Sequence, residues 1–467
     1  MNLRPDLREL NALAPPLPGG QVSRILAAAL QAADPEKLIR KSLHRRGDRL
    51  VFPDQTGISL TEIRKIYLVA VGKAAFPMVQ GVSDLLSGVD FEGILVTKQP
   101  VENGASPHFP GLNIITAGHP RPDHNSLKAG RTVHHLLGEA GRNDLVLFLL
   151  SGGGSSLLSL PLDPLQLEDL VRVNKLLLES GAAVDEINTV RKHLSRVKGG
   201  QLARRAYPAQ SVTLILSDVI GDPLHMIASG PTVPDPTTFQ NALDIVRAYH
   251  MEDQFPEAAL DVLRAGARGT LPETPKPDEA GFQENRTYLI GNNRTAALGA
   301  LEQARQEGFQ SAVLTTRLEG EARTAAAFCA AVLQEMAVSG DPLPRPACLI
   351  IGGETTVTIP DSAQAGLGGR NLEAALAAVP ILSGLKRAAL ITLATDGEDG
   401  PTPAAGAVAT GESQSRAQTL GLKPDRYLEN HNAYPFFQEL GDLIHTGSTR
   451  TNLNDLWFLF TFEEESS

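Results

Sequence analysis

The fold is indicated most directly by the segment Asp144 to Leu160, DLVLFLLSGGGSSLLSL. Its residues Leu145 to Leu150 are an unbroken apolar run of strand length, which is typical of a strand covered by helices on both faces. A run of glycines and serines follows, and then a helical pattern. Glycines let backbone N–H groups close around an anion, serines add hydroxyl donors, and a helix offers its positive end. The predicted phosphate or substrate contacts of this turn are Ser151, Gly152, Gly153, Gly154, Ser155 and Ser156. The alternative is a tight strand-to-helix turn that binds nothing.

Further buried strands surround this segment and alternate with helical patterns. They are expected at Lys65 to Gly72, Gly93 to Thr97, Leu112 to Thr116 and Val212 to Leu216. Such alternation predicts a mostly parallel, Rossmann-like sheet with helices on both faces, whose ligands bind beyond the carboxyl ends of the strands. Lys73, the loop Gly118-His119-Pro120, the glycine–serine turn and Asp218 all follow such ends.

The second half of the chain repeats this α/β pattern after a change in composition. Thr270 to Arg286, TLPETPKPDEAGFQENR, is typical of a linker. We therefore expect two domains, residues 1–275 and residues 285–467. In the second, GLGGR (366–370) opens a helix and Trp457 to Phe462 forms the closing strand.

Composition limits the classes of function. The 467 residues carry a net charge of −11, without a run of lysine and arginine, which argues against nucleic acid as a partner. The two cysteines, Cys329 and Cys348, stand in apolar segments and suggest core residues in a reducing compartment. The N-terminus lacks the apolar core of a signal peptide, and no segment has the length of a membrane span. We expect a cytoplasmic protein with no membrane partner.

Positive charge gathers in one predicted helix, Val184 to Tyr207. Arg191 and Lys198 are seven residues apart and would share one face of it. In an acidic protein this face is a candidate substrate or phosphate contact, and the alternative is a solvated basic face.

The motifs of several nucleotide-binding classes are missing. The chain has no Walker A sequence, no dinucleotide-binding fingerprint and no protein-kinase signature. Its glycine-rich turns, lysine and arginine at turns, and carboxylates after strands are what phosphoryl transfer requires. Asp218 and Asp396 are candidate metal ligands, and Asp218 is also a candidate general base. An aspartate before glycine can equally serve as a turn or cap residue.

Long motifs then resemble a known family, the glycerate 2-kinases of the MOFRL type. They include VGKAAFPM (71–78), SGGGSSLL (151–158), NTVRKHLSRVKGGQLA (188–203), ASGPTVPDPTT (228–238), GLGGRNLEAALA (366–377) and TDGEDGPT (395–402). The resemblance runs from about Ile66 to Leu456. It implies ATP-dependent phosphorylation of D-glycerate at the 2-hydroxyl, Mg²⁺ or another divalent cation, and an active site in a cleft between the two domains. It also implies key roles for a lysine and an arginine, which correspond to Lys73 and Arg370.

The chain departs from the family pattern at Arg121, Leu372, Pro403, Asn432 and Arg450. These departures concern local contacts. Two other functions stay open: an NAD(P)-dependent hydroxypyruvate reductase and a non-catalytic module that binds small anions. D-glycerate and ATP are the expected small-molecule partners, and a homodimer is left open.

Overall fold

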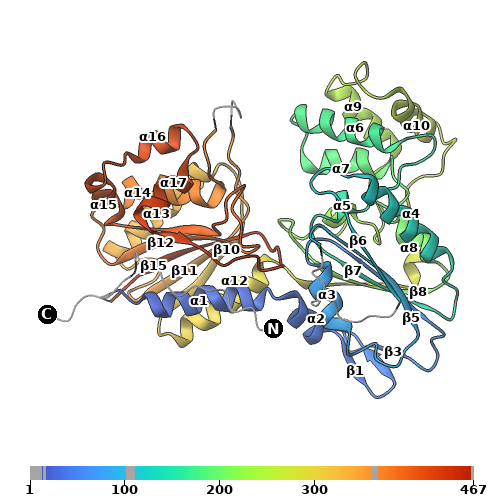
Figure 1. The fold of residues 1–467 in the computed structure, drawn as a ribbon, viewed down its shortest axis with the longest axis horizontal. Helices are drawn as coiled ribbons and strands as arrows, with labels where there is room; N and C mark the ends of the chain where they lie inside the picture. The colour runs from blue at the N-terminus through green and yellow to red at the C-terminus, as the bar shows by residue number, and fades with distance from the viewer. Residues whose placement is uncertain (1–12, 14–16, 101–110, 360–364, 464–467) are drawn as a thin grey trace. The chain divides into compact units, whose positions relative to one another are not determined.

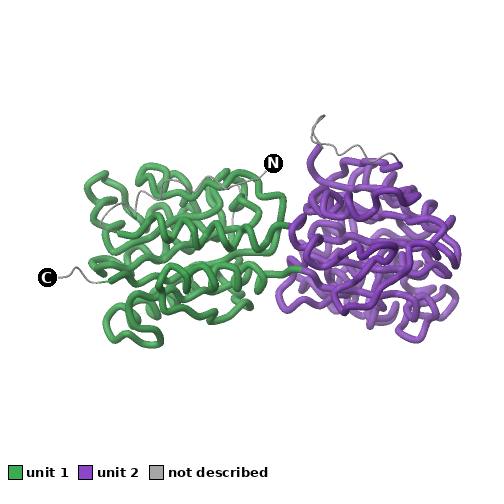
Figure 2. Tube along the Cα trace, turned by 90° about the horizontal axis from the view of Figure 1, so that it is seen from below, with its two compact units in different colours: residues 1–34, 291–467 green, residues 35–290 purple. Residues whose placement is uncertain are grey.

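The computed structural model describes residue 13 and residues 17–100, 111–359 and 365–463. The chain forms two compact units (Figure 2). We call residues 35–290, purple in Figure 2, the first unit, and residues 1–34 and 291–467, green in Figure 2, the second unit. Within the described residues, none of the helices has both the length and the apolar character that crossing a bilayer requires.

The first unit is built on a six-stranded sheet in the order β6-β5-β4-β7-β8-β9. The strands are β4 (Ile66–Val71), β5 (Phe91–Thr97), β6 (Leu112–Thr116), β7 (Leu145–Leu150), β8 (Gln210–Leu216) and β9 (Asn285–Gly291). The pairs from β6 through β8 are parallel, with Val71 opposite Leu150 and Leu150 opposite Ile215. This register brings the carboxyl ends of β4, β7 and β8 to one level of the sheet. Every residue of β4 and β7 is buried, as their apolar runs predict.

Helices cover this sheet and form a separate group above it (Figure 1). Those beside the sheet include α3 (Ala75–Val82), α4 (His124–Gly138), the short α5 (Gly154–Leu157) and α8 (Gln201–Ala206). The second group consists of α6 (Leu167–Glu179), α7 (Val184–Lys192), α9 (Phe239–Ala248) and α10 (Glu257–Ala267), which share an apolar core. The remaining elements are α2 (Pro35–Ser42), the small sheet of β1 (His44–Arg46), β2 (Arg49–Val51) and β3 (Gly57–Ser59), a 3₁₀ turn (Ile227–Ser229) and α11 (Ala280–Gln283).

The helix predicted over Val184 to Tyr207 is wrong in one respect, because it is two helices. Helix α7 ends at Lys192 and α8 begins at Gln201. Between them Gly199 and Gly200 have φ angles of +54° and +83°, a left-handed conformation that only glycine adopts without strain. Arg191 and Lys198 therefore do not share a helical face.

The second unit contains a mixed six-stranded sheet, in the order β10-β11-β15-β12-β13-β14. The strands are β10 (Gln310–Leu318), β11 (Ala347–Gly353), β12 (Ala388–Ala394), β13 (Gly406–Thr410), β14 (Leu443–Ile444) and β15 (Asp455–Thr461). The pair β10–β11 is parallel and the other pairs are antiparallel. The closing strand β15 is buried along its whole length and lies between β11 and β12.

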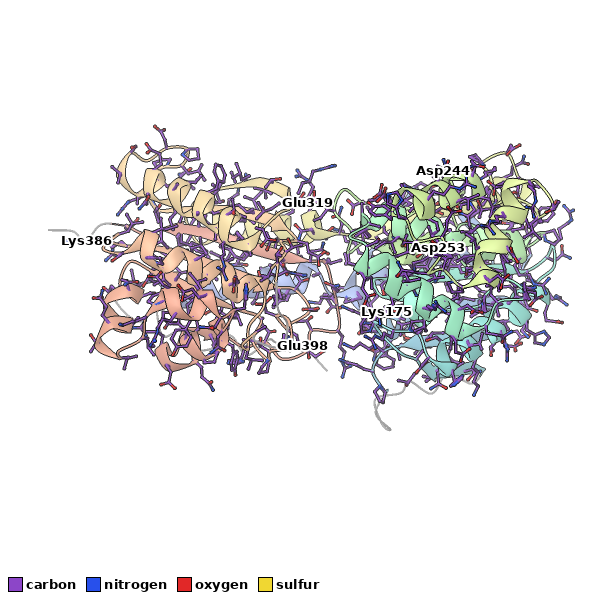
Figure 3. The ribbon with its side chains drawn as sticks, turned by 90° about the horizontal axis from the view of Figure 1, so that it is seen from above. Lys175, Asp244, Asp253, Glu319, Lys386 and Glu398 are labelled. Carbon is purple, nitrogen blue, oxygen red and sulfur yellow. The ribbon has the colours of Figure 1, made fainter. Side chains whose placement is uncertain are left out.

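Helices pack on this second sheet and carry the rest of its core. They are α1 (Gly19–Ala32), α12 (Asn293–Gln306), α13 (Ala322–Val338), α14 (Arg370–Leu382), α15 (Ser413–Thr419), α16 (Pro424–Glu429) and α17 (Ala433–Leu440). Charged side chains such as Glu319, Lys386 and Glu398 project from the ribbon of this unit into solvent, as Lys175, Asp244 and Asp253 do from the first (Figure 3).

The limits of the units differ from the expected division at residues 275 and 285. Helix α1 belongs to the second unit because it packs closely on α12, where a Cβ on Gly299 would lie 2.4 Å from the Cβ of Ala32. The segment predicted to be a linker is built into the first unit. There Thr274 is buried, Lys276 Nζ donates to Asp235 O at 3.0 Å, and β9 extends the sheet.

Candidate functional site

The glycine–serine turn follows β7 as predicted and is fixed by bonds to the loop after β4. The N–H of Lys73 donates to Gly152 O at 2.9 Å, and the N–H of Ala74 donates to Ser151 Oγ at 3.0 Å. Ser156 Oγ donates to Gly153 O at 3.2 Å. Ser151 and Ser156 thus stabilise the turn itself. The helix that follows, α5, has only four residues, so its dipole is a smaller source of positive potential than the sequence suggested.

The atoms that lie closest to the Cβ positions of the glycines identify the surroundings of the turn. A Cβ on Gly152 would lie 1.8 Å from Asp218 Oδ2. A Cβ on Gly153 would lie 3.0 Å from His119 Cδ2 and 3.3 Å from Lys73 Cγ. Gly153 also has a φ of +81°, which favours glycine. Side chains that follow β4, β6 and β8 therefore meet over the turn.

His119 also belongs to this group. The sequence placed its loop at a strand end, but His119 was not among the predicted site residues. Burial, with a further contribution from the positive charges of Lys73 and Lys98, lowers the pKa of His119 to about 4. The imidazole is therefore neutral at pH 7. The signal for it in the sequence was its place directly after the strand Leu112 to Thr116, at the same edge of the sheet as Lys73 and Asp218.

Arg191 and Lys198 converge on the other side of the turn, despite the break between their helices. Arg191 Nη2 donates to Ser155 O at 3.1 Å, and Lys198 Nζ donates to Leu158 O at 3.0 Å and also to Ser155 O. Burial lowers the pKa of Arg191 to about 10. Burial and then the neighbouring Arg191 charge lower the pKa of Lys198 well below its usual value.

These two cations differ from their neighbour Lys192 in the groups that surround them. Lys192 Nζ lies 3.3 Å from Asp235 Oδ1, and both side chains are buried. Among the described residues, Arg191 and Lys198 have no carboxylate partner, and their hydrogen bonds go to backbone carbonyls. Buried charges are normally paired, so this pair of cations fits an anionic ligand such as a carboxylate or a phosphate.

Arg370, in the second unit, is surrounded by carboxylates. It is the first residue of α14. Its Nε donates to Asp455 Oδ2 at 2.6 Å and its Nη2 to Asp455 Oδ1 at 3.3 Å, while Nη1 lies 2.6 Å from Glu354 Oε1. The guanidinium group of Arg370, which the sequence suggested would contact substrate, is thus already paired with Asp455. Asp455 was not among the residues predicted from the sequence.

Asp399 caps the same helix from the loop that follows β12. Its carboxylate accepts from the N–H of Asn371 at 3.1 Å and from the N–H of Leu372 at 2.8 Å. Burial raises the pKa of Asp399 to about 7. Asp396, the candidate metal ligand, lies three residues before it and accepts the N–H of Glu398 at 3.2 Å. Asn432, one of the departures from the family pattern, accepts the N–H of Leu367 at 2.8 Å.

A divalent cation was expected at Asp218 and Asp396. Over the described ranges, no group of three or more histidine, cysteine, aspartate or glutamate side chains is arranged to hold a metal ion. This arrangement is compatible with Mg²⁺ only if the ion is held by one or two carboxylates together with the phosphate oxygens of a nucleotide. Asp218 and Asp396 stay predictions as metal ligands.

Together, the parallel sheet, the glycine–serine turn at the carboxyl ends of its strands and the mixed sheet define a two-domain α/β protein. Residues 347–455 match the model of the MOFRL family, and residues 21–264 match that of a domain of unknown function, DUF4147. The chain belongs to the glycerate 2-kinase family of the MOFRL type.

Individual relatives cover nearly the whole chain. It is 40% identical over 428 residues to a D-glycerate 2-kinase of Thermotoga maritima, covering 91% of this chain and 98% of that protein. It is 39% identical to a glycerate 2-kinase of Pyrococcus horikoshii, covering 93% and 95%. The crystal structure of a glycerate kinase from Thermotoga maritima matches with a TM-score of 0.82 at 37% identity, covering 95% of this chain and 99% of that one.

Proposed function

We propose that the protein is a glycerate 2-kinase, which transfers the terminal phosphoryl group of ATP to the 2-hydroxyl of D-glycerate and forms 2-phospho-D-glycerate and ADP. The observation that carries this proposal is the pair of cations, Arg191 and Lys198, that have no carboxylate partner among the described residues beside a glycine turn. Membership in a family whose members are named as glycerate kinases supports it.

The anionic groups of the substrates are proposed to bind at the turn. Glycerate carries a carboxylate, and ATP carries phosphate oxygens. Arg191 offers a planar fork to such groups and Lys198 a point charge. The absence of a Cβ atom at Gly153 is proposed to let an anion approach the backbone beside Lys73, while the space at Gly152 is taken by the carboxylate of Asp218.

For the transfer itself we propose three roles. Asp218 orients the 2-hydroxyl and accepts its proton as the new O–P bond forms and the bond to the ADP oxygen breaks. Lys73 stabilises the negative charge on the moving phosphoryl oxygens. The neutral imidazole of His119 accepts a hydrogen bond from substrate, since a pKa of about 4 makes it a weak base at pH 7.

Arg370 and the divalent cation complete the proposal. We propose that Mg²⁺ is held by phosphate oxygens together with Asp218 or Asp396, and that it neutralises charge on the phosphates. Arg370 is proposed to act in catalysis while it keeps its ion pair with Asp455. A cytoplasmic location, which two free, buried cysteines support, and a homodimer are part of the same proposal.

Phosphorus NMR of the product is the experiment that tests this function. With ATP, Mg²⁺ and D-glycerate, we expect ADP and a phosphomonoester on carbon 2. The reductase alternative predicts oxidation of NADH by hydroxypyruvate with no new phosphorus signal. A relative in Agrobacterium vitis, 38% identical, carries the name hydroxypyruvate reductase only provisionally. Binding of glycerate without turnover in either assay would leave only the anion-binding module.

A further inference from the structure

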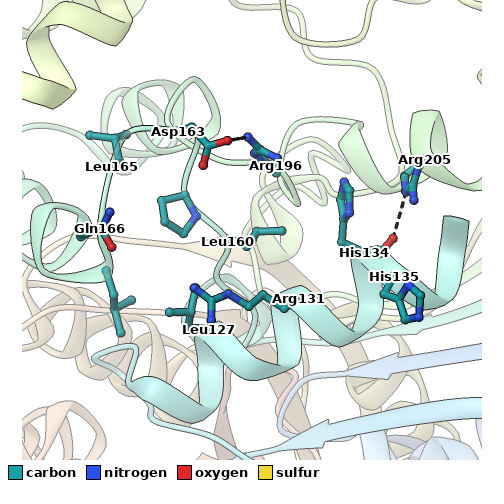
Figure 4. A pocket seen from close by; sticks show the side chains of 12 residues that line it. Leu127, Arg131, His134, His135, Leu160, Asp163, Leu165, Gln166, Arg196 and Arg205 are labelled. Atoms are coloured by element: carbon teal, nitrogen blue, oxygen red, sulfur yellow. Dashed lines mark hydrogen bonds and ion pairs between the residues drawn. The ribbon is translucent and has the colours of Figure 1, made fainter.

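A cavity of about 380 Å³ lies in the first unit, away from the glycine–serine turn (Figure 4). It is bordered by α4, by the segment from Leu160 to Leu167 and by α8. None of Lys73, the turn residues 151–156 or Asp218 lines it. Its volume is in the range of sites for small organic ligands and is larger than one inorganic phosphate needs.

The walls of this cavity are basic in a protein that is acidic as a whole. Three arginines line it, Arg131, Arg196 and Arg205, together with one carboxylate, Asp163, so the formal charge of the wall is 3 − 1 = +2 with both histidines neutral. Arg196 is paired with Asp163. Among the described residues, Arg131 and Arg205 have no carboxylate partner. Burial, and then the charges of Arg205 and Arg196, lower the pKa of the lining residue His134.

The side chain of Arg205 is held at the wall by a hydrogen bond and by packing against a glycine. Its Nε donates to His134 O at 2.9 Å, the bond drawn in Figure 4. Its guanidinium lies across Gly138, the last residue of α4, where a Cβ would be 1.9 Å from Nη2 and 2.6 Å from Cζ. Any other residue at position 138 would move the guanidinium away.

We propose that this cavity is a second ligand site, which binds a small organic phosphate with two or more negative charges. The guanidinium groups of Arg131 and Arg205, which have no carboxylate partner in the described part of the chain, offer forks that match phosphate oxygens. The remaining volume accommodates the organic part of the ligand. Arg131 and Arg205 are exposed, so the site is accessible from solvent.

The site is connected to the turn through two adjoining segments, which suits a regulatory ligand. Pro161 and Ser195 form a β-bridge, and the N–H of Arg196 donates to Leu160 O at 2.8 Å. The same pair of segments brings Lys198 Nζ to Leu158 O. A ligand that draws Arg196 away from Asp163 therefore acts on the segment that positions Lys198.

Calorimetry on the full chain tests the proposal with fructose 1,6-bisphosphate, 2-phosphoglycerate, inorganic phosphate and, as an uncharged control, glucose. We expect at least one organic phosphate to bind at millimolar concentration or below, more tightly than inorganic phosphate, while glucose does not bind. Arg131→Gln combined with Arg205→Gln should weaken this binding about tenfold or more. The matched control, Arg142→Gln with Arg268→Gln, removes the same charge from exposed arginines of this unit that do not line the cavity.

Gly138→Ala is a second variant that changes no charge and suits a helix better than glycine. It should also weaken binding, because it displaces Arg205. Lys198→Met separates this site from the turn, and it should leave the binding of fructose 1,6-bisphosphate intact. In NMR titrations, the bound phosphate should raise the pKa of His134. The proposal is overturned if none of the organic phosphates binds, if both arginine double variants lose binding equally, or if only Lys198→Met abolishes it.

Discussion

The cationic side chains of the two predicted site regions lie in opposite electrostatic environments. Around the turn of the first unit, Arg191 and Lys198 are bonded to carbonyls and have no carboxylate partner among the described residues. At the start of α14 in the second unit, Arg370 is bonded to Asp455 and Glu354. Although burial alone would lower the pKa of Arg370, the charges of these two carboxylates and of Asp399 raise it. Within the described ranges, the two cations of the first region therefore lack a carboxylate partner, whereas Arg370 already has two.

This difference separates two roles that the sequence alone made look alike. A buried cation without a partner is costly, so the first region gains most from binding an anion. An arginine that is already paired with carboxylates, such as Arg370, mainly stabilises the fold. An anion that binds it must compete with those carboxylates. Variants of the first region should therefore lose activity with little change in stability, whereas variants of Arg370 should lose stability as well as activity.

The largest expected effect is that of Gly153→Val. The new side chain would press on His119 and Lys73 and fill the place of the anion, so turnover should fall about a thousandfold, or about 4 kcal/mol. Gly181→Val is the matched control, because Gly181 has a φ of +76° and nothing lies within 4 Å of its Cβ position. It should keep its turnover in a coupled ADP assay. Equal losses in both variants would show that backbone strain is the cause.

Next in size is the effect of Arg370→Ala on stability. It leaves Asp455, which is 4% exposed, without its counter-charge, and should lower the free energy of unfolding by about 3 kcal/mol in urea denaturation. Glu354→Gln removes the more exposed partner and should cost less than about 1 kcal/mol. If Arg370→Ala unfolds like the parent and loses only turnover, the ion pairs of this arginine do not contribute to stability as proposed.

A smaller effect is expected for Lys198→Met, which keeps the length of the side chain and removes the charge. The KM for the anionic substrate should rise about thirtyfold, near 2 kcal/mol, with the unfolding transition preserved. Lys175→Met, which changes an exposed lysine of the same unit, should behave like the parent. An unchanged KM with a lower melting temperature would mean that Lys198 only supports the turn.

Much of this comparison could be predicted from the sequence. The strand before the turn was predicted at Leu145 to Leu150 because both of its faces are buried, and the gathering of Lys73 and Asp218 followed from the parallel order of the strands. The position of Lys198 beside the turn was not predicted. The sequence placed Lys198 with Arg191 on one helical face as a substrate or phosphate contact, whereas Lys198 reaches the turn from the irregular segment before Gly199 and Gly200.

What the sequence could not supply was pairing across long separations. Asp455 and Asp399 reach Arg370 and α14 from 85 and 28 residues away in the chain, as their bonds to Arg370 and Asn371 show. Local patterns identify such aspartates only as strand or turn residues. The place of β15 in the middle of its sheet was hidden for the same reason, because strand order depends on contacts between distant segments.

The effect that is smallest per step of the measurement is the pH dependence of stability in the second unit, because it is spread over several pH units. The pKa of Asp399 is raised to about 7 in the folded protein, whereas an unfolded aspartate titrates near 3.9. Between these values the folded state binds the additional proton, so stability is greatest at the acidic end and falls as pH rises towards 7, by at most about 1.4 kcal/mol per pH unit. Asp442, whose pKa is raised to about 6, acts in the same direction. Asp399→Asn should reduce the slope and leave the part due to Asp442, as measured by urea denaturation at several pH values. The lost acceptor at Leu372 costs the same at every pH, so only the slope reports the titration. A slope equal to that of the parent would mean that Asp399 stays ionised across this range and that the charge of Arg370 outweighs its burial.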